Sequence, residues 1–263
     1  MNIIFEKMYY RTQSVFIYFQ KKLLKKRLGL ATNIDYRIEL LKTLYPIKGC
    51  VEKSDILIDV GANEGKFSQI FSDIYHPSIL MCIEPNEQLN SFILMNNEKY
   101  GPIIINKAIS DKETEMDFYI HPDSQMSSLF SSNKVFLMRD FAQDDAELIM
   151  RKTIPVTTLD ALFLQYYKDM MGKIIFLKID TQGNELDVIK GGRNALKVIS
   201  YCLLEYMFQT PYKKQYSFED IVAIMSENGF ICRGPMHQSS RTTGEVGAVL
   251  FLFINKKLQK PIS

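Results

Sequence analysis

From residue 54 onward, short apolar runs alternate with segments in which apolar positions recur every three or four residues. The runs predict strands buried on both faces of a sheet, and the segments between them predict helices. Strands that alternate with helices indicate an α/β fold with a doubly wound, mostly parallel sheet. The expected strands are residues 55–60, 78–84, 102–109, 115–120, 173–180, 200–206, 230–233 and 248–254. The expected helices are residues 66–73, 85–97, 159–168, 185–196 and 217–228.

Three stretches depart from this alternation. Residues 3–29 place apolar side chains on one side of a helix and basic ones on the other. A second short helix is expected at 33–44, before Pro46. Residues 121–156 are polar and rich in serine, and an interruption of this length is typical of a segment that covers a functional site. Within it, residues 139–150 are compatible with a helix. We therefore expect an N-terminal helical extension over residues 1–50 and a globular domain over residues 51–263.

Charge is unevenly distributed along the 263 residues. Residues 1–27 contain seven basic side chains and one acidic one, whereas the rest of the chain has a small excess of acids. A mildly acidic body is a poor electrostatic match for nucleic acid, so no nucleic-acid partner is expected. Residues 1–27 suit a helix lying on the anionic inner face of a membrane. They suit equally a helix that packs on the body or on a second copy in a homo-oligomer.

Cysteine and histidine are too sparse to suggest a metal site. The four cysteines, Cys50, Cys82, Cys202 and Cys232, lie far apart in sequence, so a CxxC-type zinc or redox site is excluded. Only three histidines are available as further ligands. Reduced thiols without a secretory pattern predict a cytoplasmic protein, and no apolar run approaches the ~20 residues of a membrane span.

Candidate chemistry gathers where the expected parallel strands end. Ligands of open α/β sheets bind beyond the carboxyl ends of the strands. Four loops meet there, residues 59–65, 84–86, 109–111 and 180–185. Each of them carries a carboxylate, and these are Asp59, Glu84, Asp111 and Asp180.

The first of these loops, residues 59–65, is poorly suited to a pyrophosphate. Gly61 and Gly65 allow close approach of a ligand, but Asn63 replaces the middle glycine of the GxGxxG pattern and Glu64 adds negative charge. The loop suits a ligand without phosphate, such as the methionine end of S-adenosylmethionine. Glu84 could bridge two ribose hydroxyls of either cofactor, so a nicotinamide-dependent oxidoreductase stays as an alternative.

Six segments of the chain follow one another in a characteristic order, and these are ILIDVGANEGKFS (56–68), CIEPNEQLNSFILMN (82–96), INKAISD (105–111), SSL (127–129), VTTLD (156–160) and FLKIDTQGNELDVIKGG (176–192). Together they resemble the FkbM family of S-adenosylmethionine-dependent methyltransferases, from about residue 55 to residue 230. The resemblance implies a class I methyltransferase fold, which is Rossmann-like and has seven strands with an antiparallel last strand. It also implies methyl transfer to a hydroxyl of a sugar or glycan, a polyketide or a similar metabolite. A non-catalytic, membrane-associated adaptor with the same fold is the alternative from another class.

The resemblance also implies roles for individual residues. Asp59, Gly61, Asn63 and Gly65 would hold the methionine moiety of the cofactor, Glu84 its ribose, and Ser110 with Asp111 its adenine. Asp180 would face the sulfonium and the acceptor, and it is a candidate catalytic residue.

A second candidate catalytic residue is Glu205, which interrupts an apolar strand, where a carboxylate usually has a partner or a function. Gln182 stands where many family members have glutamate, so we do not expect this position to act as an acid. Glu185 could act directly or merely shape the following helix. His121 and His237 are weaker candidates for substrate contact.

Overall fold

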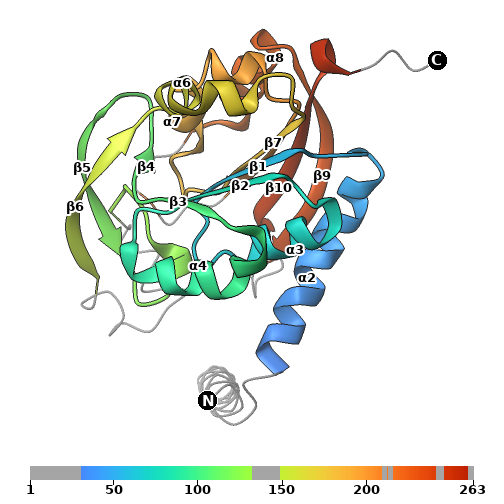
Figure 1. Ribbon diagram of the computed structural model, residues 1–263. Helices are drawn as coiled ribbons and strands as arrows, with labels where there is room; N and C mark the ends of the chain where they lie inside the picture. The colour runs from blue at the N-terminus through green and yellow to red at the C-terminus, as the bar shows by residue number, and fades with distance from the viewer. Residues whose placement is uncertain (1–30, 132–148, 209–211, 213–215, 241–245, 260–263) are drawn as a thin grey trace, which may run out of the picture. The chain divides into compact units, whose positions relative to one another are not determined.

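The computed structural model describes residues 31–131, 149–208, 212, 216–240 and 246–259 (Figure 1). The chain forms two compact units, residues 1–42 and residues 43–263, and the second unit contains every described strand. The expected division after residue 50 stays a prediction. The helix expected at 3–29 lies outside the described residues. So does the helix expected at 139–150, apart from residues 149 and 150. No helix of the described ranges combines the length and the apolar character needed to cross a membrane.

A seven-stranded sheet with the order β3-β2-β1-β7-β8-β10-β9 forms the centre of the second unit. Strand β10 runs antiparallel to both of its neighbours, while the other strands run parallel to one another. This confirms the class I methyltransferase fold with an antiparallel last strand. The strands are β1 (Ile56–Val60), β2 (Ile79–Ile83), β3 (Ile103–Ile105), β7 (Ile175–Ile179), β8 (Tyr201–Met207), β9 (Phe230–Ser240) and β10 (Val246–Asn255).

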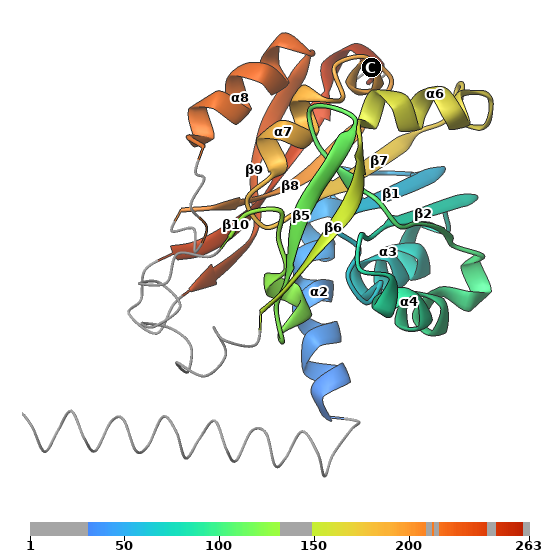
Figure 2. The ribbon, with the colours of Figure 1, turned by 90° about the vertical axis from the view of Figure 1, so that its left-hand side faces the viewer.

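Helices cover both faces of this sheet, as a doubly wound fold requires. In Figures 1 and 2, α3 and α4 lie on one face, and α6, α7 and α8 lie on the other. The central strands are apolar along their whole length because both faces are covered. The helices of the second unit are α3 (Lys66–Tyr75), α4 (Asn90–Asn97), α6 (Leu159–Met170), α7 (Glu185–Lys190) and α8 (Phe218–Glu227), with short 3-10 turns at Glu87–Leu89, Glu98–Tyr100, Ser124–Met126, Ala195–Lys197 and Lys256–Leu258.

A second, three-stranded sheet has the order β4 (Ala108–Ile109), β6 (Met150–Thr157) and β5 (Thr114–Ile120). The strand expected at 115–120 is confirmed as β5, which runs antiparallel to β6. Strand β6 was not expected, because it falls within the polar stretch 121–156. Only Ile154, Val156 and Thr157 of β6 are buried, so its sequence carries little of a strand pattern.

Several expected boundaries are wrong for local reasons. The expected strand 102–109 splits between the two sheets, and Asn106 marks the break by donating to the carbonyl oxygen of Glu84 at 2.9 Å. The expected helix 185–196 ends at Lys190, and Gly191 follows it at a position where a Cβ would lie 2.0 Å from the carbonyl oxygen of Ser110. Helix α2 (Ala31–Lys48) continues past Pro46, whose ring sits in the last turn and removes a single helical hydrogen bond.

Candidate functional site

The loops after β1 and β7 touch at the carboxyl edge of the sheet. Gly61 has a φ of +79°, and a Cβ at this position would lie 1.9 Å from the carbonyl oxygen of Asp180. Only glycine permits this approach. Asn63 also adopts the left-handed region, with a φ of +51°, and its side-chain nitrogen donates to Ser124 Oγ at 3.0 Å. The loop is therefore held between the β7 end and the segment that follows β5.

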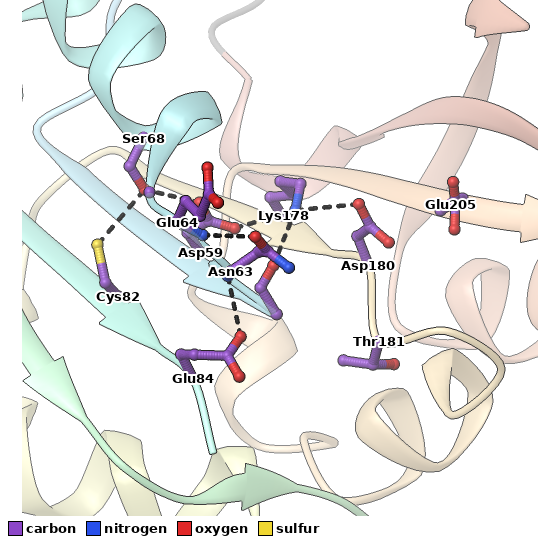
Figure 3. Close-up of polar contacts among 12 residues, drawn as sticks. Asp59, Asn63, Glu64, Ser68, Cys82, Glu84, Lys178, Asp180, Thr181 and Glu205 are labelled. Carbon is purple, nitrogen blue, oxygen red and sulfur yellow. Dashed lines mark hydrogen bonds and ion pairs between the residues drawn. The ribbon is translucent and has the colours of Figure 1, made fainter. Parts of the chain in front are cut away.

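A buried ion pair joins β1 to β7 directly beneath this edge. Asp59 and Lys178 are register partners in the two strands, and their side chains are 0% and 6% exposed. Lys178 Nζ lies 3.1 Å from Asp59 Oδ1, 3.3 Å from Asp180 Oδ2 and 3.4 Å from the carbonyl oxygen of Gly61. Figure 3 shows the ammonium group between the two carboxylates. Lys178 thus ties the two loops together electrostatically.

Asp59 points into the protein rather than toward the open edge of the sheet. Its Oδ2 accepts a hydrogen bond of 2.6 Å from Ser68 Oγ of α3. Burial raises the pKa of the Asp59 carboxyl, while the charge of Lys178 and the Ser68 hydrogen bond oppose that rise. The structure therefore gives Asp59 a place behind the loop, where it anchors Lys178. Its role toward the methionine moiety stays a prediction.

Glu84 holds the loops after β1 and β2 together. It is 5% exposed, its Oε2 accepts from the Asn63 N–H at 2.9 Å, and its Oε1 accepts from the Asn86 N–H at 2.9 Å. Burial raises the pKa of Glu84 to about 7, although both hydrogen bonds favour the ionised form. A carboxylate oxygen that accepts one hydrogen bond retains capacity for another, so both oxygens can still bind hydroxyl groups.

Asp180 and Glu205 lie side by side just beyond β7 and within β8. Ile179 is the register partner of Leu204, so the next residues in each strand are neighbours. The side-chain nitrogen of Gln182 donates to Asp180 Oδ1 at 3.0 Å and to Glu205 Oε2 at 2.9 Å. The sequence predicted both carboxylates, and the structure brings them together through a residue to which it assigned no role.

The pKa values of Asp180 and Glu205 are shifted in opposite directions. Burial acts to raise the pKa of Asp180, but Lys178 and the hydrogen bond from Gln182 hold it below its ordinary value. Burial and the neighbouring charge of Asp180 raise the pKa of Glu205 well above its ordinary value. Adjacent carboxyls resist double ionisation for this reason. Of the two carboxyls, Asp180 therefore favours the ionised form and Glu205 favours the protonated form.

Glu185 shapes the turn between β7 and α7. Its Oε1 accepts from the backbone N–H of Thr181 at 2.9 Å and of Gly183 at 3.0 Å. Burial raises the pKa of Glu185 to about 7. Both interactions lie within the turn, which favours a structural role for this residue over direct catalysis.

Ser110 and Asp111 differ in their surroundings. Ser110 is buried, and its Oγ lies 3.4 Å from Asn184 Oδ1, while Asn184 donates to the carbonyl oxygen of Ile109 at 2.7 Å. Asp111 is exposed at the end of its loop. Both residues follow β4, which belongs to the three-stranded sheet and not to the central one as expected. Their contact with adenine stays a prediction.

The two candidate histidines are not equivalent. His121 is buried, and its Nδ1 accepts from the backbone N–H of Asp123 at 3.0 Å, so it shapes the turn that begins this segment. His237 lies on β9 with Leu250 between it and Glu205 across the sheet. Among the residues that the structure describes, no group of three or more histidine, cysteine or acidic side chains is arranged to hold a metal ion.

Sequence reasoning missed Lys178, Ser128 and Tyr212. A signal existed for Lys178, because a lysine inside an apolar strand needs a buried partner. Ser128 donates to the carbonyl oxygen of Gln182 at 2.7 Å, and the Tyr212 hydroxyl lies 3.0 Å from Gln182 Oε1. Ser128 lies in the segment SSL (127–129) but was given no role, and no sequence pattern indicated that Tyr212 would contact Gln182.

Comparison with known proteins gives consistent matches. A family model described as the methyltransferase FkbM domain matches residues 59–232. The 2-O-methyltransferase NoeI of Sinorhizobium fredii is 25% identical over 205 residues, which span 74% of this chain and 81% of NoeI.

Two solved structures illustrate the similarity at the level of coordinates. Magnesium protoporphyrin IX methyltransferase (ChlM) of Synechocystis PCC 6803, with bound SAM, is 8% identical with a TM-score of 0.46, covering 86% of this chain and 83% of that one. Precorrin-6y C5,15-methyltransferase of Geobacter metallireducens is 10% identical with a TM-score of 0.40, covering 84% and 87%.

Proposed function

The chain belongs to the FkbM family of S-adenosylmethionine-dependent methyltransferases, and from this premise we propose that it methylates a hydroxyl group of a sugar or glycan, a polyketide or a similar metabolite. The observation that carries the proposal is the pair of neighbouring carboxyls at the carboxyl edge, in which Lys178 Nζ lies 3.3 Å from Asp180 Oδ2 and the amide of Gln182 bridges Asp180 and Glu205. A carboxylate accepts a hydrogen bond from a hydroxyl and thereby fixes the position of its oxygen. The name of NoeI, a 2-O-methyltransferase, supports an oxygen acceptor.

The residues at this edge fit S-adenosylmethionine better than a dinucleotide. The N–H of Asn63 is bonded to Glu84, and the N–H of Glu64 is bonded to Asn63 Oδ1 at 2.7 Å. These groups are therefore not free to cradle a pyrophosphate, which disfavours the nicotinamide-dependent oxidoreductase. Glu84 is placed to hold ribose hydroxyls, and the acidic edge suits a positively charged ligand. The non-catalytic adaptor is disfavoured because the acidic edge is intact.

The protein's contribution to the reaction is alignment. The bound cofactor supplies an electrophilic methyl group on a sulfonium centre. Asp180 accepts the acceptor's hydroxyl proton in a hydrogen bond and turns an oxygen lone pair toward the methyl group. Lys178 keeps Asp180 ionised and fixes its Oδ2. The hydroxyl proton leaves through this hydrogen bond to Asp180 and then to water as the oxygen takes up the methyl group. The alignment therefore lowers the barrier without requiring a strong base.

The proposed function is tested by methyl transfer from S-adenosylmethionine labelled in the methyl group. Purified protein is offered sugars, glycans, polyketides and matched amino sugars, and the methylated position of each product is identified by NMR. We expect the label on oxygen. Label only on nitrogen or carbon, from a protein that binds S-adenosylhomocysteine, would contradict the proposed acceptor class.

Binding of S-adenosylhomocysteine is expected to tighten as pH rises through about 7. The pKa of Glu84 lies at about 7, and its ionised form accepts hydrogen bonds from both ribose hydroxyls, whereas the protonated form accepts fewer. Calorimetry at about pH 6 and about pH 8 measures the change. Glu84→Gln should remove this pH dependence, and Glu84→Ala should weaken binding by about 2–4 kcal/mol.

A matched control for that experiment is Glu185→Gln. The pKa of Glu185 is also about 7, but its carboxylate faces the turn 181–183. This variant should therefore keep the pH dependence. Tight binding of NAD without binding of S-adenosylhomocysteine would overturn the cofactor assignment for these residues.

Residues 1–27 are proposed to attach the protein to the inner face of a membrane. Their seven basic side chains and single acid should hold the full chain on vesicles of anionic lipid at low salt and release it at high salt. Deleting residues 1–27 should abolish sedimentation with vesicles and leave S-adenosylhomocysteine affinity unchanged. If the deletion instead alters the oligomeric state, these residues form a packing element.

A further inference from the structure

We infer that Gln182 is a positioning residue for methyl transfer, whose side-chain amide joins Asp180 and Glu205 into one pair of fixed geometry where the acceptor hydroxyl binds. This inference rests on the proposed function. The hydrogen bonds of Gln182 connect the turn after β7 with Asp180, with Glu205 of β8, with Ser128 and with Tyr212.

The orientation of the Gln182 amide is fixed by its partners. Its Nε2 lies 3.0 Å from Asp180 Oδ1 and 2.9 Å from Glu205 Oε2, so each amide hydrogen meets one carboxyl. Its Oε1 lies 3.0 Å from the hydroxyl of Tyr212. That hydroxyl is also 3.0 Å from the carbonyl oxygen of Met126, which can only accept. The single hydroxyl hydrogen of Tyr212 is therefore shared between these two acceptors. The orientation of the amide is fixed by the carboxylate of Asp180, which can only accept and therefore faces Nε2.

The backbone at Gln182 is held in an uncommon conformation. Its φ is +57°, a left-handed value that few residues other than glycine adopt. Ser128 Oγ donates to its carbonyl oxygen at 2.7 Å, and the carboxylate of Glu185 accepts from the N–H groups of Thr181 and Gly183 on either side. Such over-determined backbone is typical of a preorganised site.

A neutral donor is the group that this position requires. Lys178 from β7, Glu185 from α7 and the hydroxyl of Tyr212 surround the two carboxyls, and Asp59 lies beyond Lys178. An amide supplies two hydrogens and no charge, whereas a carboxylate in its place would add a third acid and supply none. The isosteric substitution Gln182→Glu therefore tests the pair without changing the size of the side chain.

The kinetic test compares Gln182→Glu and Gln182→Met with the control Gln165→Glu, which adds the same charge at an exposed position of α6. We expect kcat of both Gln182 variants to fall about tenfold or more, with KM for S-adenosylmethionine changed less than about twofold. The ratio of the Gln182→Glu rate to the wild-type rate should increase as pH falls, because protonation of the introduced carboxyl restores one donor. For Gln182→Met this ratio should stay constant. A wild-type kcat and pH profile in Gln182→Glu would overturn the inference.

A second measurement needs no acceptor and therefore separates this inference from the proposed function. Infrared spectroscopy detects the carbonyl band of a protonated carboxyl. The difference spectrum between wild-type protein and Glu205→Gln separates the band of Glu205 from those of Glu84 and Glu185, whose pKa values are about 7. Gln182→Met, and more weakly Tyr212→Phe, should shift this band because the amide hydrogen bond is lost or loosened. A band unaffected by both variants would show that Gln182 does not hold the pair, even if methyl transfer to a hydroxyl is found.

Discussion

Replacing Lys178 by methionine is expected to lower the free energy of unfolding by about 3–5 kcal/mol, as removal of one partner from a buried ion pair typically does. The side chain of Asp59 is 0% exposed. Without the ammonium group, its charge keeps only the hydrogen bond from Ser68. Methionine fills most of the space of lysine, so the loss reports the charge rather than a cavity. Denaturant unfolding measures it.

Lys53→Met is the matched control, because Lys53 forms an ion pair with Asp55 while 65% of its side chain is exposed. Its loss should be below about 1 kcal/mol. The loss in Lys178→Met should shrink as pH falls, since Asp59 can then take up a proton and the unpaired buried charge disappears. The double variant Lys178→Met/Asp59→Asn should recover part of the stability. Equal stability of Lys178→Met and wild type would mean that the pair does not hold β1 to β7.

The central sheet was predictable because its signals are local and strong. Strands such as β1 and β7 are continuous apolar runs, and burial on both faces permits no other composition. Helix α8 begins with Ser217 and Asp220 in a reciprocal capping arrangement, and so its start could be located. Rules for parallel sheets then place the loops after these strands at one edge.

The three-stranded sheet could not be predicted in the same way. Strand β6 has few buried positions, and it exists because β4 and β5 pair with it on either side. The requirement for glycine at position 191 depends similarly on a distant contact, its close approach to the carbonyl oxygen of Ser110. A single sequence does not reveal which two distant residues will meet in such a contact.

The candidate site also combines features that the sequence could predict with features that it could not. Topology predicted that Glu84 and Asp180 lie at one edge, and they do. The inward direction of Asp59 depends on Lys178, which faces it from β7. The bridge at Gln182 depends on a left-handed turn and on Tyr212 from an irregular segment. Side-chain partners across loops therefore mark the limit of what this sequence could predict.

Replacing Asp180 by asparagine is expected to lower the rate of methyl transfer by about a hundredfold or more, while the affinity for S-adenosylhomocysteine changes little. Helix capping does not explain Asp180, because Glu185 accepts the N–H groups of the turn before α7. The two oxygens of Asp180 instead meet Lys178 Nζ at 3.3 Å and Gln182 Nε2 at 3.0 Å. Asparagine keeps the shape but removes the charge that orients the hydroxyl. Labelled methyl transfer at saturating cofactor, with calorimetry beside it, measures both quantities.

Glu205→Gln is the matched variant that decides which carboxyl acts. Because the pKa of Glu205 is raised well above its ordinary value by burial and by the charge of Asp180, this change replaces one neutral group by another. Its rate should therefore fall by less than about tenfold. The opposite result, turnover lost in Glu205→Gln and kept in Asp180→Asn, would mean that Glu205 is the group that orients the hydroxyl. Asp180 would then serve only to hold Lys178 against the loop of Gly61.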